Sequence, residues 1–220
     1  LPTDFKLLDI AAGPGTTLFG LSLLLQRLTR SSASNPPPVR ISYASLEKQE
    51  MLQYRGLQFW RRYLKSIESP INAFLQFNTV DLFEYEKNGR SLPKKFFDFI
   101  VISHCFFADP QLRSQSNRIY RQIFQTHLKP GGWVLLVIQW TKLYKFYEIE
   151  RDENVGQERE VIQKFVGEEL GLNLQWYRYV TSTGQRTWLK NFREFADRCC
   201  PPHTQLDDLY QTYLKLNYRP

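Results

Sequence analysis

Cysteine and histidine are scarce in this chain of 220 residues, which has three of each. They are Cys105, Cys199 and Cys200, and His104, His127 and His203. The cysteines do not have the number or spacing of a disulfide framework, and neither residue type has the spacing of a zinc site. We therefore expect no metal. We also expect a reducing compartment, either the cytoplasm or the stroma or matrix of an organelle.

Long hydrophobic runs are also missing. No stretch reaches the ~20 consecutive apolar residues that a membrane span needs, and the most apolar segment, residues 18–28, is interrupted by Gln26 and Arg27. No secretory signal is recognisable before the first apolar run. With 42% hydrophobic and 23% charged residues, the composition indicates a folded domain without a membrane span.

Acidic residues are in the minority, with 22 Asp and Glu against 29 Lys and Arg, which gives a formal net charge of +7. Such a balance favours anionic partners, RNA among them. The basic residues are distributed over several segments and form no single run. The solvated faces of a basic protein therefore explain them as well as a nucleic-acid surface does.

The beginning of the chain, residues 6–28, combines a short apolar strand, a turn of small residues and an apolar helix. Gly13 and Gly15 in the turn allow a ligand or another backbone to approach closely. The start of the helix offers free N–H groups and the positive end of its dipole. This order is typical of the opening of a nucleotide-binding α/β unit, and a tight turn without a ligand is the alternative.

The turn has the spacing Asp9-x-Ala11-x-Gly13-x-Gly15, with the acid before the glycines. It resembles motif I of the class I S-adenosylmethionine-dependent methyltransferases, acid-x-Gly-x-Gly-x-Gly, with Ala11 in place of the first glycine. The resemblance implies that Asp9 acts on the amino-acid end of the cofactor. It also implies that Ala11, Gly13 and Gly15 form the turn that approaches it. A dinucleotide fold would instead carry G-x-G-x-x-G.

Two further acids follow the next two predicted strands. Glu47 ends the strand of residues 39–46, at the ribose-binding position of nucleotide folds, where a carboxylate can accept from two hydroxyls. The alternative is an acid that satisfies a helix N-terminus. Asp81 follows the strand of residues 73–79. The resemblance implies that Asp81 binds the adenine amino group and Leu82 packs on the ring, and an Asx-type turn is the alternative.

The strongest strand signal is residues 96–103, which are apolar at nearly every position after Asp98, as in a central parallel strand. The strand ends in Ser103 and His104, at the edge where open parallel sheets bind ligands. We assign Ser103 to the cofactor-binding residues and His104 as the candidate general base. His104 could equally line the pocket or be structural. Cys105 is a weaker nucleophile candidate because no proline precedes it.

The second half of the chain continues the same alternation. A helix is predicted from Asp109 to about Leu128, and Lys-Pro-Gly-Gly at residues 129–132 precedes a strand at 133–139. This turn resembles a motif of the same methyltransferase class. The aromatic and basic segment 140–147 is predicted to line the acceptor site or to form a hydrophobic lid. A helix at 159–170 precedes an antiparallel hairpin of residues 172–181 and 186–192.

These elements predict an α/β, Rossmann-like three-layer sandwich. Its sheet has seven mostly parallel strands and ends in an antiparallel hairpin. We expect a class I methyltransferase domain at residues 1–192 and a C-terminal helical extension at 193–220 that packs on the same domain.

The resemblance, which covers about residues 6–192, implies a methyltransferase (a transferase) that uses S-adenosyl-L-methionine. The acceptor is open, and the basic charge favours RNA or a ribosomal particle weakly. A methyltransferase-like binding or assembly protein without turnover is the first alternative, and a nicotinamide oxidoreductase is the second.

Overall fold

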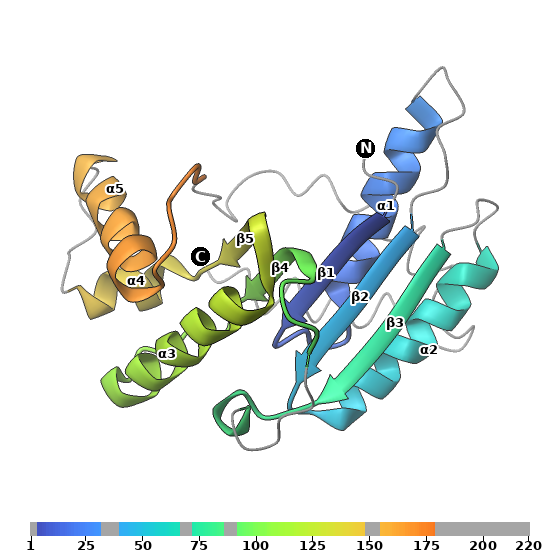
Figure 1. Cartoon of the computed structure of the whole chain (residues 1–220), viewed down its shortest axis with the longest axis horizontal. Coiled ribbons are helices and arrows are strands. Elements are labelled where there is room, and N and C mark those ends of the chain that lie inside the picture. Colours follow the sequence, from blue (N-terminus) through green and yellow to red (C-terminus); the bar gives the residue numbers. More distant parts are fainter. Residues whose placement is uncertain (1–3, 32–39, 67–71, 86–91, 148–154, 179–220) are drawn as a thin grey trace, which may run out of the picture. The chain divides into compact units, whose positions relative to one another are not determined.

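The computed structural model describes residues 4–31, 40–66, 72–85, 92–147 and 155–178 (Figure 1). The chain divides into two units, and the first, Leu1–Gly56 with Ser69–Tyr177, contains all the strands described. Of the second unit, which includes Leu57–Glu68, the described part is the second half of one helix and the single residue Arg178. The site discussed below lies in the first unit.

The described strands form one parallel sheet of five strands in the order β3-β2-β1-β4-β5. They are β1 (Asp4–Ile10), β2 (Arg40–Glu47), β3 (Asn72–Thr79), β4 (Phe97–Ser103) and β5 (Leu128–Val137). The chain adds β2 and β3 on one side of β1 and then crosses to add β4 and β5 on the other. Such a reversal of strand order leaves a crevice at the carboxyl ends of β1 and β4, where open α/β sheets bind ligands.

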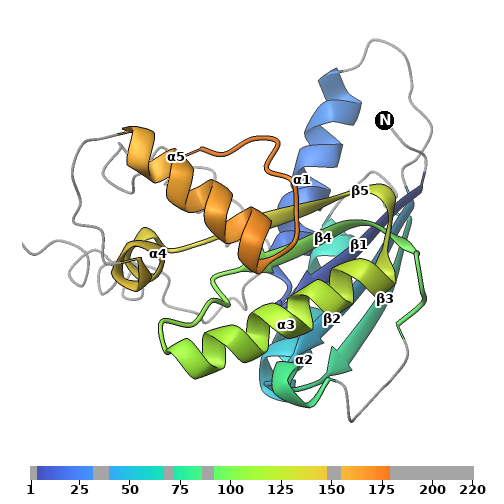
Figure 2. The same ribbon diagram turned by 60° about the vertical axis from the view of Figure 1, so that its left-hand side comes forward.

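Helices cover both faces of this sheet. They are α1 (Thr16–Ser31), α2 (Glu50–Ser66), α3 (Pro110–His127), α4 (Trp140–Phe146) and α5 (Val155–Lys164), with a 3₁₀ turn η1 (Leu82–Glu84) and a π-helical turn η2 (Phe165–Glu169). In Figures 1 and 2, α1 and the first half of α2 lie on one face and α3 on the other. The fold is therefore a Rossmann-like α/β sandwich, as predicted.

The core follows from strands that are buried on both faces. The last four residues of β1, residues 7–10, are all buried, which is the pattern of a central parallel strand. On the α3 face, Ile100 and Ile102 of β4 pack in one cluster with Tyr120 and Ile123 of α3, and all four are fully buried. This packing fixes the level at which the strands end and the loops of the site begin.

Two helix ends have the predicted local chemistry. The side chain of Asp109 caps α3 by accepting from the backbone N–H of Leu112 at 2.9 Å, and Pro110 follows at the first helical position. After α5 the π-helical turn ends at Gly171, whose φ of +66° is the left-handed conformation that terminates helices. The helix predicted at 159–170 thus begins earlier, at Val155, and ends in a π-helical turn.

The five predicted parallel strands are confirmed with shifted ends, and β5 differs most. It begins at Leu128 and includes the Lys-Pro-Gly-Gly segment, with an irregularity opposite Phe97 and Phe99 of β4. The segment predicted as an acceptor wall or lid forms the helix α4.

Within the described residues the structure shows neither strand of the predicted hairpin, so five of the seven predicted strands are present. Residues 172–178 form no strand, and residues 179–192 lie outside the described residues, as does the predicted extension at 193–220. The predicted domain boundary therefore stays a prediction.

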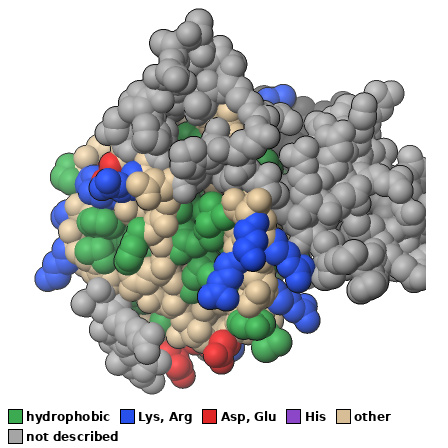
Figure 3. Space-filling view, turned by 90° about the vertical axis from the view of Figure 1, so that its right-hand side faces the viewer, with side chains coloured by type: hydrophobic (Ala, Val, Ile, Leu, Met, Phe, Trp, Pro, Cys, Tyr) green, Lys and Arg blue, Asp and Glu red, His purple; other side chains and the backbone are tan. Residues whose placement is uncertain are grey.

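Besides β5, the other edge of the described sheet is β3. Phe74, near its beginning, is 68% exposed, and Asn72 and Gln76 point to solvent on the same strand. Figure 3 looks onto this side of the molecule and shows hydrophobic side chains beside Lys and Arg at the surface. Within the described residues, no helix has both the length and the apolarity that crossing a bilayer would require.

Candidate functional site

The carboxylate at the end of β2 is joined to the glycine turn after β1. Glu47 is 8% exposed, and its Oε2 accepts from the backbone N–H of Gly13 at 2.8 Å. Its Oε1 accepts from the N–H of Gln49 at 2.9 Å. The parallel pairing of β1 with β2 puts Ile10 beside Leu46, so the predicted turn and the predicted acid meet at one edge. A carboxylate has about four acceptor positions, so Glu47 retains capacity for two more donors.

The turn itself is built from left-handed residues. Ala11 and Gly13 both have φ of +54°, and Gly15 has φ of +78°. The N–H of Ala11 donates to the carbonyl of Leu46 at 2.8 Å, which ties the turn to β2. An alanine in this conformation costs about 1–2 kcal/mol, so the departure from glycine at this position is tolerated at a price in strain. A Cβ on Gly13 would meet nothing within 4 Å, so the space beside the turn is open.

Asp9 is completely buried beneath this turn. Its Oδ2 accepts from the hydroxyl of Tyr43 at 3.0 Å, and its Oδ1 has no hydrogen-bond partner within the described part of the chain. Burial raises the pKa of Asp9 from 3.8 to about 6, although the hydroxyls of Tyr43 and Thr17 lower it and the charge of Glu47 raises it further. At neutral pH the site therefore holds a buried carboxylate at a cost in folding free energy.

Asp81 follows β3 and lies at the same edge of the sheet. Its Oδ1 accepts from the N–H of Phe83 at 3.0 Å, and its Oδ2 is 2.7 Å from the Nζ of Lys48. Lys48 lowers the pKa of Asp81 through its hydrogen bond and charge. Leu82 begins η1 and packs half-buried against the core. The alternative Asx-type turn is thus present, and the adenine roles of Asp81 and Leu82 stay predictions.

Ser103 and His104 end β4 beside β5. Ser103 is half-buried and pairs with Val137, and the backbone N–H of His104 donates to the carbonyl of Val137 at 2.9 Å. The side chain of His104 is exposed, and its φ is +59°. Left-handed backbone is uncommon in residues other than glycine and is concentrated at functional sites. The structure places His104 at the crevice mouth, and its role as a base stays a prediction.

Cys105 follows His104 after the end of β4. Burial raises the pKa of its thiol, and the hydroxyl of Tyr120 donates to its backbone carbonyl at 2.6 Å. The charges of Glu47, Lys142 and Asp81 also act on this thiol. A raised pKa keeps the thiol protonated, which weakens Cys105 further as a nucleophile.

A shallow pocket lies beyond the ends of β4 and β5. Its walls are largely apolar and include three polar side chains. The pocket is lined by the apolar residues Phe106, Phe107, Ile138, Leu143 and Phe165 and by the polar residues Arg113, Asn117 and Lys142. In α4, Leu143 is buried in the core and Lys142 lines the pocket, and the role of segment 140–147 as an acceptor wall or a lid stays a prediction.

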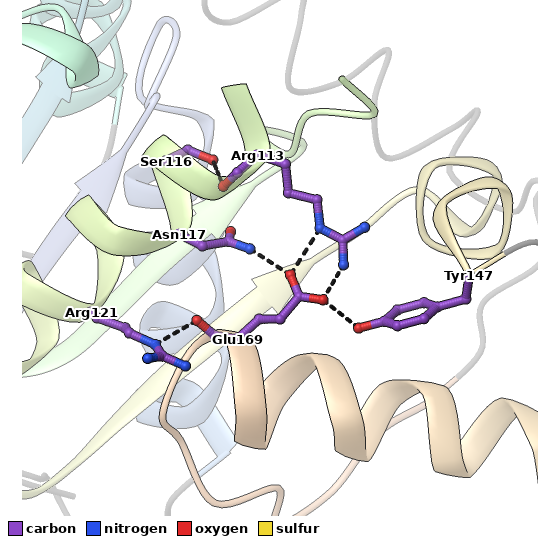
Figure 4. A network of polar contacts seen from close by, with 6 residues as sticks. All are labelled: Arg113, Ser116, Asn117, Arg121, Tyr147 and Glu169. Atoms are coloured by element: carbon purple, nitrogen blue, oxygen red, sulfur yellow. Dashed lines mark hydrogen bonds and ion pairs between the residues drawn. The ribbon is translucent and has the colours of Figure 1, made fainter. Parts of the chain in front are cut away.

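One wall of this pocket is held by a buried ion pair (Figure 4). The guanidinium of Arg113, which stacks on the ring of Phe146, makes a bidentate contact with the carboxylate of Glu169, one branch at 2.8 Å. Asn117 and Tyr147 donate to the same carboxylate at 2.7 and 2.5 Å. This network joins α3, α4 and η2. No local pattern predicts this network, because Arg113 and Glu169 are 56 residues apart in the chain.

Three residues at this edge of the sheet, Tyr43, Lys48 and Gly56, were not predicted from the sequence. Tyr43 and Lys48 hold Asp9 and Asp81, and register between strands is needed to see either pair. Gly56 of α2 lies against the turn, because a Cβ at this position would be 2.3 Å from the carbonyl oxygen of Pro14. A glycine inside an amphipathic helix was the only available signal for this close approach. The described residues contain no cluster of His, Cys, Asp and Glu able to hold a metal ion.

Comparison with known proteins gives matches among solved structures alone. No family model and no curated protein matches the chain. A SAM-dependent methyltransferase from Methanosarcina mazei is 21% identical with a TM-score of 0.39, over 62% of this chain and 53% of its own. An arsenic(III) S-adenosylmethionine methyltransferase from Chlamydomonas reinhardtii is 15% identical with a TM-score of 0.41, over 60% and 38%. A SAM-dependent methyltransferase from Aquifex aeolicus is 16% identical with a TM-score of 0.41, over 76% and 71%.

The chain thus spans about half, or less, of the first two of these proteins. Identities and scores of this size do not assign an activity, so the function has to be argued from the site itself.

The residues present fit an adenosyl amino-acid cofactor. Asp9 has a buried oxygen without a partner in the described chain, Gly13 leaves open space at the turn, and Glu47 has unused acceptor capacity. Carboxylates of this kind suit an ammonium group and a pair of sugar hydroxyls. A pyrophosphate would instead meet the negative charges of two acids at the turn, which is unfavourable.

Proposed function

We propose that this chain is an S-adenosylmethionine-dependent methyltransferase. The observation that carries the proposal is the link between Gly13 and Glu47 at the switch point of the sheet, with the buried Asp9 beside it. It combines a glycine turn with two acids in the place where open α/β sheets bind their ligands. The two acids, at the ends of β1 and β2, make a site for a cationic and hydroxyl-rich ligand.

The cofactor, when bound, supplies an electrophilic methyl group, so the protein mainly has to align the acceptor. In this proposal Asp9 holds the amino-acid end, Glu47 the ribose and Asp81 the adenine, with Leu82 against the ring. Ala11, Gly13, Gly15 and Ser103 line the remaining surface. His104 is the candidate base for an acceptor that must lose a proton.

The acceptor is proposed to enter through the shallow pocket between α3 and α4. Its aromatic walls suit a planar group, and Lys142 adds positive charge. An RNA base remains a prediction from the basic composition, and small molecules and proteins fit the same description.

A methyltransferase-like binding protein without turnover is the second candidate. It is favoured by one observation: among the described residues, no side chain makes a hydrogen bond that would orient the ring of His104. General bases in active enzymes are usually oriented by a neighbouring group. Loss of chemistry with retention of cofactor binding would leave such a histidine.

Binding and turnover can be separated in one experiment. A thermal-shift panel compares S-adenosylhomocysteine with NAD and NADP, since a ligand that binds the native state raises the melting temperature. Stabilisation by S-adenosylhomocysteine alone is expected, and stabilisation by the dinucleotides alone would contradict the proposal. Transfer of labelled methyl from the cofactor to RNA, protein or small-molecule fractions then distinguishes an enzyme from a binding protein.

A further inference from the structure

Tyr43 lies next to both Asp9 and the glycine turn. It is on β2, beside Leu7 of β1, and is 1% exposed. Its hydroxyl donates to Oδ2 of Asp9 at 3.0 Å and would lie 3.5 Å from a Cβ on Gly15. The ring also packs edge-on against Phe77 of β3 at 5.8 Å between centroids. The hydroxyl therefore lies directly under the turn, fixed by packing from both neighbouring strands.

The hydrogen bond divides the two oxygens of Asp9 into different roles. Oδ2 is held by Tyr43, whereas Oδ1 is buried and has no partner in the described chain. A buried acceptor without a partner costs about 1–3 kcal/mol, so a structure rarely retains one without a reason. A cationic ligand at the turn would supply the missing favourable interaction.

Resting on the function proposed above, we propose that Tyr43 is a positioning residue for the cofactor site. It holds Oδ2 of Asp9 and leaves Oδ1 for the ammonium group of the cofactor's amino-acid end. Binding of that ammonium group is coupled to the release of the proton that part of the free protein carries on Asp9. When the ligand binds, protonated Asp9 loses its proton to solvent, and no other bond forms or breaks.

The groups that face Asp9 support this coupling. On β2 they are Tyr43 and the carboxylate of Glu47, and on α1 the hydroxyl of Thr17. The two hydroxyls favour the anion and Glu47 opposes it, while burial raises the pKa of Asp9 to about 6. Near pH 6, about half of the free protein therefore carries the proton. A ligand cation lowers the pKa of a nearby carboxyl and drives that proton off.

Calorimetry measures this coupling without reference to turnover. S-adenosylhomocysteine is titrated into the protein at pH 6 and pH 8, each in two buffers with different ionisation enthalpies. The dependence of the binding heat on the buffer gives the number of protons released. The wild type should release up to about half a proton at pH 6 and almost none at pH 8. No release at pH 6 would overturn the inference.

The variant Tyr43→Phe tests the residue itself. Loss of the hydroxyl should raise the pKa of Asp9, so that proton release at pH 6 increases and its maximum moves to higher pH. Asp9→Asn should bind more weakly and release no proton. Tyr120→Phe, which removes an equally buried hydroxyl bonded to the carbonyl of Cys105, is the matched control and should release protons like the wild type.

The outcomes separate the two proposals. If S-adenosylhomocysteine fails to bind the wild type at any pH, the proposed function itself fails. If it binds but Tyr43→Phe leaves proton release unchanged, the inference about Tyr43 is wrong while the function stands. Should Tyr43→Phe not fold, the comparison of wild type with Asp9→Asn decides, because equal proton release by these two would contradict the coupling.

Discussion

Replacing Asp9 with asparagine should stabilise the protein without ligand at neutral pH. Burial places the pKa of Asp9 at about 6 against 3.8 in an unfolded chain, a difference of about two pH units. At about 1.4 kcal/mol for each unit, the buried charge costs about 3 kcal/mol at pH 7. An asparagine removes the charge but leaves a buried amide donor, which costs about 1–3 kcal/mol. The net expectation for Asp9→Asn at pH 7 is a gain of up to about 2 kcal/mol.

The pH dependence gives this prediction its signature. The group has a raised pKa in the folded state, so the stability that the protonated form contributes is complete below pH 3.8 and is lost as the pH rises through about 6. About half of the loss falls between pH 5 and pH 7.5. Urea unfolding of wild type and Asp9→Asn across this range should therefore show a difference that grows with pH.

A control of opposite sign is available in Asp81. Lys48 lowers its pKa, so its charged form stabilises the fold, and Asp81→Asn should be less stable than the wild type at pH 7. This difference should shrink as the pH falls. If Asp9→Asn is less stable than the wild type by the same amount at every pH, Asp9 is not an unfavourable buried charge and the reasoning is refuted.

Three further predictions concern packing, the pocket wall and the ribose acid. Gly56→Ala should lower the free energy of unfolding by about 1–3 kcal/mol in thermal unfolding, because its Cβ would be 2.3 Å from the carbonyl oxygen of Pro14. The control Gly20→Ala, at an exposed position of α1 with no neighbour within 4 Å, should stabilise the protein by about 1 kcal/mol. Equal effects of the two substitutions would contradict this packing. Glu169→Gln should lower the free energy of unfolding in urea by about 3 kcal/mol, because it leaves Arg113 charged and buried. The control Glu168→Gln, at the exposed neighbouring position, should change this free energy little. An unchanged stability of Glu169→Gln would show that the network does not stabilise the fold. Glu47→Gln should weaken the binding of S-adenosylhomocysteine about 10–100-fold in calorimetry. The control Glu50→Gln, at an exposed position of α2, should bind with the affinity of the wild type. Equal affinities of the two variants would show that Glu47 does not bind the ligand.

The sheet could be predicted because its strands are local signals. Residues 7–10 and 96–103 are apolar runs with one acid in each, and they are bounded by turn residues. The ends of these runs lie within a few residues of the ends of β1 and β4. The start of β5 was missed because proline and two glycines normally end a strand. Here they are accommodated by the irregular pairing opposite β4.

The candidate site could be predicted only where its residues lie at strand ends. That Asp9 and Glu47 lie at one edge could be predicted because the carboxyl ends of parallel strands meet there, and their binding roles stay predictions. Tyr43 was not, since its hydroxyl reaches Asp9 through a strand register that no local pattern contains. The same holds for Arg113 and Glu169, which helix packing brings together.

The most direct test is a crystal structure of the protein soaked with S-adenosylhomocysteine, supported by calorimetric affinity. The account predicts the ligand at the carboxyl ends of β1 and β2, with its ribose hydroxyls on Glu47 and its amino-acid end at the turn from Ala11 to Gly15. A ligand bound elsewhere, or no binding at millimolar concentration with Glu47 still occupied only by Gly13 and Gln49, would contradict it.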